Sequence, residues 1–303
     1  MDNTSDIARN SSNSPQLSPE ETDRLLVKVK QQLAEDTFDT SDRALITQMV
    51  ESMGDKRGLV RLNFAESLGK VGKPAVPSLL DALANHQNVV VRRAAAKTLT
   101  LISDPTAVPH LVRALLTDED PVVKGSTVGA LAQTGEVSAT PLLKVLSSPD
   151  SPESTKGLAA WGLAFIGSKA KDKLYEAYNS DSPEVRAAVV GAIAKVAEEN
   201  REPHALELLV NSLDDSAANV RSEAAAALGN LAYPPAVPHL IELLNYPDGE
   251  TRKSAALSLM KLKNLDALEP LKNARERETE DGVKRAISLA ITQLERATEN
   301  DWE

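Results

Sequence analysis

The sequence predicts an all-α protein, an α-solenoid made of stacked helical hairpins. Three observations predict this fold. A Val-Arg pair, or a close equivalent, recurs at an almost fixed interval along most of the chain. Apolar residues follow each pair at helical spacing, and a proline-containing break then precedes a second, shorter apolar run. Regular repetition with a period of about 30 residues is typical of arrays in which one supersecondary unit stacks on the next.

The recurring pair, which we call the anchor, marks the start of each repeat. It occurs as Val60-Arg61, Val91-Arg92, Val123-Lys124, Thr155-Lys156, Val185-Arg186, Val220-Arg221, Thr251-Arg252 and Val283-Lys284. Counted from the first anchor residue, positions +4, +8 and +11 are predominantly apolar. With ~3.6 residues per turn these positions share one helix face. Each repeat is therefore expected to begin with an amphipathic first helix.

A second helix is expected in the other half of each repeat. The chain reads KPAVPSLL from Lys73, PTAVPHLV from Pro105 and PPAVPHLI from Pro234. Proline is tolerated in the first turn of a helix, where its missing N–H would have no intrahelical partner. The Leu pairs that follow supply the apolar face of a short helix, and Asp, Ser, Pro and Asn end the repeat.

The two ends of the chain depart from the repeat. We expect residues 1–17 to be disordered because they are polar and rich in Ser and Asn. Residues 18–57 are expected to form an atypical helical hairpin that caps the array, beginning with a capping box from Ser18 to Glu21. Residues 58–298 form the predicted solenoid, with Val283 opening a C-terminal capping helix. Residues 299–303 are a short acidic tail. The segment 198–202 is expected to be an insertion between the helices of the fifth repeat.

The anchor Arg or Lys has a structural explanation. Acidic residues lie in the loop before most anchors, as in Asp118 and Asp120 or Asp248 and Glu250. A ladder of ion pairs between repeats is the expected use of these residues, rather than an anion site. Arg92 is the expected exception, because its loop reads HQNV and has no carboxylate.

The consensus VRxxAAxxLGxxxxPxAVPxLLxxL resembles the HEAT family. It is most similar to the short variety, with repeats of about 30 residues, found in phycobilisome-lyase-type proteins of cyanobacteria. The similarity covers roughly residues 58–298. The resemblance implies an Asp–Arg ladder between repeats. It also implies a setting in which such chains attach bilins to phycobiliprotein cysteines or detach them, often as heterodimers of two HEAT chains.

Composition excludes several classes of function. The formal net charge of −10 and the pI of about 5.1 give no basic footprint for nucleic acid. No apolar run approaches the ~20 residues that span a membrane. The chain has no cysteine, which excludes disulfides, thiolate metal sites and a thiol nucleophile. The start of the sequence has no signal-peptide or transit-peptide pattern, so we expect a cytoplasmic protein.

The sequence contains no catalytic motif that we recognise, and the four histidines do not predict a metal site. G-x-S-x-G, H-E-x-x-H, P-loop and dinucleotide fingerprints are absent. His110 and His239 occupy equivalent places in second helices four repeats apart, too far to share a metal. The residues favour a binding protein over an enzyme, and the resemblance leaves a lyase activity open.

The candidate binding residues lie on two surfaces. Second helices usually line the concave side of a solenoid, where extended partners bind. We expect partner contacts there from His110, Arg113, Tyr175, Tyr178, His239 and Glu242. On the outer side of the first helices, positions +2 and +6 carry Gly125, Gly129, Gly157 and Gly191 near Trp161. Either Trp161 lies across a neighbouring helix in a notch made by glycine, or it anchors a ligand in a shallow groove.

Three functions fit these observations. The first is a non-catalytic scaffold or adaptor that docks another protein on the solenoid surface. The second, implied by the resemblance, is a bilin lyase or bilin chaperone subunit that acts on a phycobiliprotein with a second HEAT-repeat subunit. The third is a HEAT-repeat partner of an iron–sulfur scaffold protein. In that case the cluster ligands come from the partner, because this chain holds no cofactor ligands of its own and has no cysteine.

Overall fold

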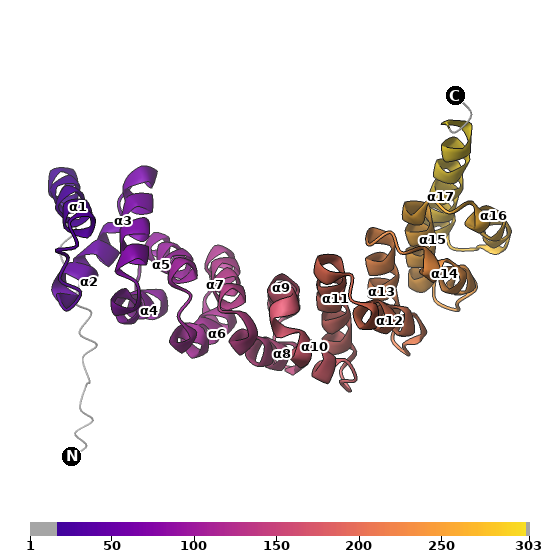
Figure 1. Ribbon diagram of the computed structural model, residues 1–303, viewed down its shortest axis with the longest axis horizontal. Helices are drawn as coiled ribbons and strands as arrows, with labels where there is room; N and C mark the ends of the chain where they lie inside the picture. The colour runs from indigo at the N-terminus through magenta and orange to yellow at the C-terminus, as the bar shows by residue number, and fades with distance from the viewer. Residues whose placement is uncertain (1–16, 301–303) are drawn as a thin grey trace, which may run out of the picture. The chain divides into compact units, whose positions relative to one another are not determined.

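The structure is a computed structural model that describes residues 17–300, with side chains described up to residue 296. The predicted disordered segment lies outside this range except for Leu17, as does most of the acidic tail. Residues 17–300 are helical and contain no β-strand, which confirms the all-α prediction. The chain forms two compact units, Met1–Ala130 (the N-terminal unit) and Leu131–Glu303 (the C-terminal unit), each a stack of helical hairpins (Figure 1).

The N-terminal unit begins with the predicted hairpin, α1 (Pro19–Ala34) and α2 (Arg43–Ser52). The capping box is confirmed: Ser18 Oγ accepts a hydrogen bond from the Glu21 backbone N–H, and a Glu21 carboxylate oxygen accepts one from the Ser18 N–H. The unit continues with α3 (Gly58–Val71), η1 (Lys73–Ala75), α4 (Val76–Asn85), α5 (Val89–Ile102), η2 (Pro105–Ala107), α6 (Val108–Thr117) and the start of α7 (Pro121–Gln133). Helices α1, α3 and α5 pack side by side, and α2 packs against α3 and α4.

The C-terminal unit repeats the same arrangement. Its elements are η3 (Gly135–Ser138), α8 (Ala139–Ser147), α9 (Glu153–Ile166), η4 (Gly167–Ala170), α10 (Lys171–Ala177), α11 (Pro183–Asn200), α12 (Pro203–Asn211), η5 (Ser212–Asp214), α13 (Ala218–Asn230), η6 (Pro234–Ala236), α14 (Val237–Leu243), α15 (Gly249–Leu262), η7 (Leu265–Ala267), α16 (Leu268–Arg277) and α17 (Asp281–Asn300). The first helices α9, α11, α13, α15 and α17 form one layer, each packed on the next. The second helices α10, α12, α14 and α16 form the other layer.

The anchor has a constant structural place. In every repeat its first residue is the third residue of the first helix, from Val60 in α3 to Val283 in α17. The proline-containing breaks form 3-10 turns ahead of the second helices, as in Pro105–Ala107 and Pro234–Ala236. The expectation for 198–202 was wrong in part: residues 198–200 extend α11 by nearly a turn, and Arg201 ends it in the left-handed conformation.

The predicted ladder is present, but its arginines pair with an acid in the loop before the next anchor, not in the loop before their own anchor. Arg92 is a full member: its Nε donates to Asp118 Oδ2 at 2.9 Å. The carboxylate therefore comes from the loop between α6 and α7, which precedes the next anchor, and not from the HQNV loop that precedes Arg92. That earlier loop supplies backbone instead, since Arg92 Nη1 donates to the carbonyl oxygens of His86 and Gln87.

The same arrangement recurs in the C-terminal unit. Arg186 forms a two-pronged pair with Asp215 at 2.8 Å for each contact, and Arg252 pairs with Glu278 at 2.7 and 2.9 Å. Each of these arginines also donates Nη1 to the carbonyl oxygens five and six residues earlier. Two parallel N–H···O bonds to a carboxylate are strong and directional. Each ladder arginine thus ties its own loop to the loop of the following repeat.

Between the helices the core is close-packed and built from small and medium aliphatic side chains. Position +8 is fully buried along the array, as at Leu68, Leu163 and Leu228. At Gly229 an added Cβ would lie 2.9 Å from the Ser258 Cα, so glycine is what permits this close approach of α13 and α15.

Candidate functional site

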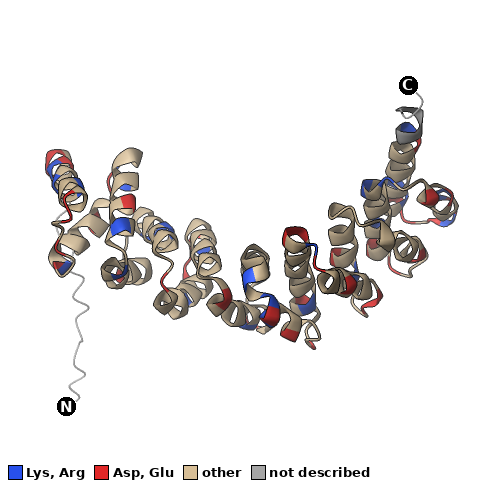
Figure 2. Cartoon of the chain, viewed as in Figure 1, with Lys and Arg blue, Asp and Glu red and all other residues tan. Residues whose placement is uncertain are grey.

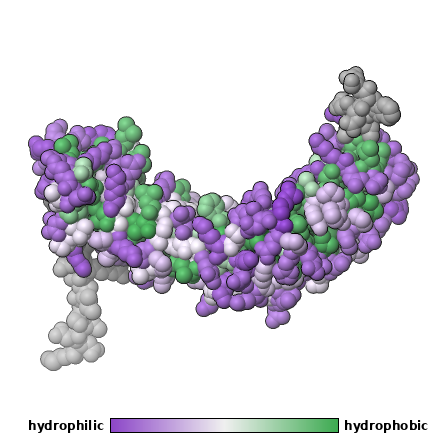
Figure 3. Space-filling model, viewed as in Figure 1, coloured by the Kyte–Doolittle hydropathy of each residue, from purple (hydrophilic) through white to green (hydrophobic). Residues whose placement is uncertain are grey.

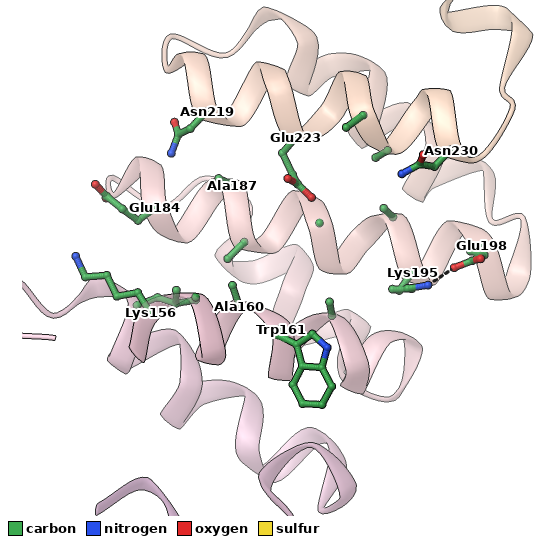
Figure 4. Close-up of a pocket in the computed structure, with 18 of the residues that line it drawn as sticks. Lys156, Ala160, Trp161, Glu184, Ala187, Lys195, Glu198, Asn219, Glu223 and Asn230 are labelled. Atoms are coloured by element: carbon green, nitrogen blue, oxygen red, sulfur yellow. Dashed lines mark hydrogen bonds and ion pairs between the residues drawn. The ribbon is translucent and has the colours of Figure 1, made fainter. Parts of the chain in front are cut away.

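A groove crosses the first helices of three successive repeats in the C-terminal unit (Figure 4). Its volume is about 870 Å³, within the range of about 300–1,000 Å³ typical of small-molecule sites. We call it the α11 groove, because α11 forms its floor and α9 and α13 form its walls. All of its lining residues belong to the C-terminal unit, from Leu146 to Leu231.

The floor is smooth because α11 presents small side chains to it. Ala187, Ala188, Gly191 and Ala194 occupy successive positions on the outer face of this helix and line the groove. A glycine within a helix costs about 1 kcal/mol relative to alanine. A run of such residues on an exposed helix face leaves room for a flat ligand to approach the backbone.

The α9 wall carries an exposed aromatic pair. Trp161 is 51% exposed and Phe165 is 60% exposed, and their ring centroids lie 5.5 Å apart. A Cβ added at Gly157, one turn earlier, would meet no atom within 4 Å. On the neighbouring α11, the three atoms nearest to a Cβ added at Gly191 all belong to Glu223, so Trp161 does not fill the space at that glycine. The indole is half exposed, and its role as a ligand anchor remains a prediction.

The α13 wall places a carboxylate opposite Trp161. The Glu223 side chain leans across to α11, and a Cβ added at Gly191 would lie 2.7 Å from Glu223 Oε1 (Figure 4). Its outer side remains open to solvent, but the surrounding walls displace much of its hydration. This desolvation raises the pKa of the Glu223 carboxyl. Sequence reasoning missed Glu223, although the glycine at 191 gave an indirect signal.

Charged side chains occupy the two ends of the groove. At one end Lys156 pairs with Glu153 at 3.0 Å, and Glu184 accepts a hydrogen bond from the Ser182 hydroxyl. At the other end Lys195 pairs with Glu198, while Arg201 makes no ion pair with any residue from 17 to 296. The groove therefore carries charges of both signs at its ends, and its middle is apolar and partly aromatic apart from Glu223.

The remaining predicted residues are distributed over the second helices. His110 and Arg113 of α6 line a pocket of about 370 Å³ in the N-terminal unit, together with His86. His239 and Glu242 are exposed on α14. None of these four contributes to the α11 groove, so their role in partner binding remains a prediction.

Tyr175 and Tyr178 are engaged in packing within the C-terminal unit. The Tyr178 hydroxyl lies 3.0 Å from both the Leu208 carbonyl oxygen, to which it donates, and Ser212 Oγ. The Tyr175 ring meets the His204 ring edge-on, with centroids 5.0 Å apart, and burial raises the pKa of Tyr175 to about 12. Both tyrosines thus join α10 to the following repeat. A partner-binding role for them also remains a prediction.

The N-terminal unit has its own exposed apolar side chains on first helices. Leu59 and Leu62 of α3 and Leu101 of α5 are largely exposed, and Figure 3 shows hydrophobic surface over α3. Leu101 lies beside Gly125 and Gly129, where an added Cβ would meet nothing within 4 Å.

Acidic and basic residues are interspersed along the helices of both units (Figure 2). Among the described residues no group of three or more His, Asp or Glu side chains could hold a metal ion. None of the helices in residues 17–300 combines the length and apolar character that a membrane span requires.

Comparison with known proteins defines the class of protein first. The family model for HEAT repeats matches residues 76–153, 139–228 and 206–292, so this is a HEAT-repeat α-solenoid. The karyopherin Kap121p shares the fold: its free form superimposes with a TM-score of 0.57 at 12% identity, and its complex with Ste12p with 0.59 at 13%. The matches cover 93% and 92% of this chain but 38% of the karyopherin.

A much closer relative comes from a cyanobacterium. The bilin biosynthesis protein MpeU of Synechococcus sp. (strain WH8020) is 42% identical over 279 residues, which cover 92% of this chain and 94% of the relative. The chain therefore belongs to the short-repeat, phycobilisome-lyase-type branch of the HEAT-repeat family.

Proposed function

We propose that this protein binds a linear tetrapyrrole, a bilin, and presents it to a cysteine of a phycobiliprotein, as a lyase subunit or a chaperone. The observation that carries the proposal is the 42% identity, over almost the whole chain, to a bilin biosynthesis protein. This relationship favours bilin handling over the general adaptor that the residues alone favoured. No comparison supports an iron–sulfur partner.

The α11 groove suits such a substrate. A bilin is a flat, conjugated chain of four pyrrole-type rings with two propionate groups. The floor of Ala and Gly admits a flat body, and the open Trp161 face can stack on a ring. Arg201 at one end makes no ion pair with any residue from 17 to 296 and is available to a propionate. Lys156 and Lys195 would exchange their glutamate partners for a propionate.

In the attachment of a bilin, the cysteine comes from the acceptor protein. A cysteine thiol adds across an exocyclic double bond of the terminal ring: sulfur bonds to the exocyclic carbon and a proton is taken up by the adjacent ring carbon. The addition needs no oxidant or reductant. Because this chain has no cysteine, the sulfur belongs to the acceptor protein. The role left to the groove is to bind the bilin, orient it and shield it from water.

Absorption titration with biliverdin, used as the probe tetrapyrrole, tests the proposal. We expect saturable binding by the wild type, about tenfold or more weaker in Trp161→Ala, with an unchanged melting temperature because the indole is half exposed. Leu265→Ala is the matched control, since Leu265 is an exposed apolar residue of the same unit outside the groove. For the attachment step, a bilin with an exocyclic ethylidene group replaces biliverdin, a phycobiliprotein apo-subunit is added, and a covalent adduct is sought on a denaturing gel. Absence of both binding and adduct would refute the proposal.

A further inference from the structure

The carboxylates that line the α11 groove differ in how their charge is satisfied. Glu153 and Glu198 pair with lysines of their own helices, and Glu184 accepts a hydrogen bond from Ser182. Glu223 has no hydrogen bond or ion pair with any described residue. It is also the carboxylate that projects over the floor of the groove instead of standing at an end (Figure 4).

The position of this carboxylate depends on a glycine. The Glu223 Cγ, Cδ and Oε1 atoms would lie 3.7, 3.5 and 2.7 Å from a Cβ at residue 191. With any other residue at 191, the carboxylate would have to shift from this position. The absence of a side chain at Gly191 thus leaves room for the unpaired Glu223 carboxylate above the middle of α11, between α13 and Trp161.

The Glu223 side chain is exposed on its outer side and turns its carboxylate towards the floor of the groove, where no group from residues 17–296 pairs with it. Burial away from water penalises a charged group unless hydrogen-bond donors replace the lost solvent. The helices that face Glu223 supply none, because α11 presents Ala187, Ala188 and Ala194 there and α9 presents Ala160 and Ala164. In the free protein water serves the exposed side of this carboxylate. A ligand that displaces water from the groove has to supply hydrogen-bond donors in its place.

We propose that Glu223 binds the pyrrole nitrogens of the tetrapyrrole and that Gly191 positions it to do so. This inference rests on the proposed function. A linear tetrapyrrole carries its N–H groups along one edge, and a carboxylate can accept two of them in charge-assisted hydrogen bonds. The propionates lie on the opposite edge and remain free for the cations at the groove ends. Glu223 is then a specificity-determining residue, since flat aromatic ligands without N–H donors gain nothing from it.

Biliverdin titration of four proteins tests this role. Glu223→Gln keeps the shape of the side chain and removes its charge, so binding should weaken about tenfold or more. The long-wavelength absorption shift that accompanies stabilisation of a protonated tetrapyrrole should also disappear. Gly191→Ala keeps the charge but displaces the carboxylate, and should weaken binding and abolish the shift in the same way. Glu207→Gln is the control, because Glu207 lies on α12 outside the groove and loses the same charge.

A second ligand distinguishes a role of Glu223 in recognising N–H groups from a role in maintaining the shape of the groove. Anilinonaphthalene sulfonate is flat and aromatic but lacks a row of pyrrole N–H groups. Its affinity for Glu223→Gln should equal or exceed that for the wild type. Wild-type binding of biliverdin with an unaltered affinity and spectrum in Glu223→Gln would overturn the inference and leave the proposed function standing. Failure of the wild type to bind biliverdin would overturn both.

Discussion

Arg221 is the ladder arginine from which the largest loss of stability is expected. It is 3% exposed, and it donates to the Asp215 carbonyl oxygen at 2.6 Å, to Asp248 Oδ2 at 2.6 Å and to Thr251 Oγ1 at 3.1 Å. Its guanidinium carbon also lies 4.0 Å from the centroid of the Tyr246 ring. Replacement by alanine removes all four contacts and leaves a cavity.

The expected loss of unfolding free energy is about 3–4 kcal/mol. Removing one member of a buried ion pair typically costs about 3–5 kcal/mol because the other charge is left unpaired. The lower part of that range applies here, since the abandoned Asp248 side chain is 35% exposed and can recover water. Loss of the bond to the Asp215 carbonyl adds about 1 kcal/mol.

Urea unfolding followed by circular dichroism measures this change, and hydrogen exchange locates it. Because repeats contact their neighbours, protection should fall in α13 and α15 and be retained in α1 and α3. Arg93→Ala is the control: Arg93 also pairs with an aspartate, Asp120, but is 38% exposed, so a much smaller loss is expected. A loss below about 1 kcal/mol for Arg221→Ala, or uniform loosening of both units, would refute the reasoning.

Two further predictions concern a glycine and a carboxylate. Gly157→Ala should stabilise the protein by up to about 1 kcal/mol in thermal or urea unfolding, because the new methyl group meets no atom; destabilisation would show that the site is more crowded than the structure indicates. Hydrogen bonds from Arg252 lower the pKa of Glu278 to about 2 from its ordinary 4.5, so the stability that Glu278 contributes should be complete above pH 4.5 and be lost as the pH falls towards 2. The stability difference between the wild type and Glu278→Gln, measured by urea unfolding across that range, should therefore shrink on acidification, and a constant difference would contradict the assignment.

The repeating part of the fold was predictable because its signals are local. Helical periodicity, the capping box at Ser18 and the anchor at the third residue of each first helix all depend on residues within one or two turns. The error at Arg92 had a different origin. Its carboxylate partner, Asp118, is 26 residues away, and the choice between the preceding and following loop depends on how one repeat is set against the next.

The candidate site was predictable only in part for the same reason. Trp161 and the small residues around it stood out because an aromatic side chain and glycines are unusual on the outer face of a helix. Glu223 did not, since an acid at an exposed helix position is ordinary. What sets Glu223 apart is that its carboxylate lies over Gly191, 32 residues earlier. The two residues meet only when α11 and α13 are packed together.

The ladder described above has a consequence for how arrays of this kind can change length. Arg92, Arg186, Arg221 and Arg252 each bind their own loop and one or two acids of the next loop, so each of these joints is complete within two adjacent repeats. Inserting or deleting one whole repeat would create one new joint from the same two parts and leave all others as they were. The α11 groove has no such freedom, because it extends over three successive first helices. Duplication of a repeat would therefore leave the α11 groove intact unless the new repeat were inserted between α9 and α13.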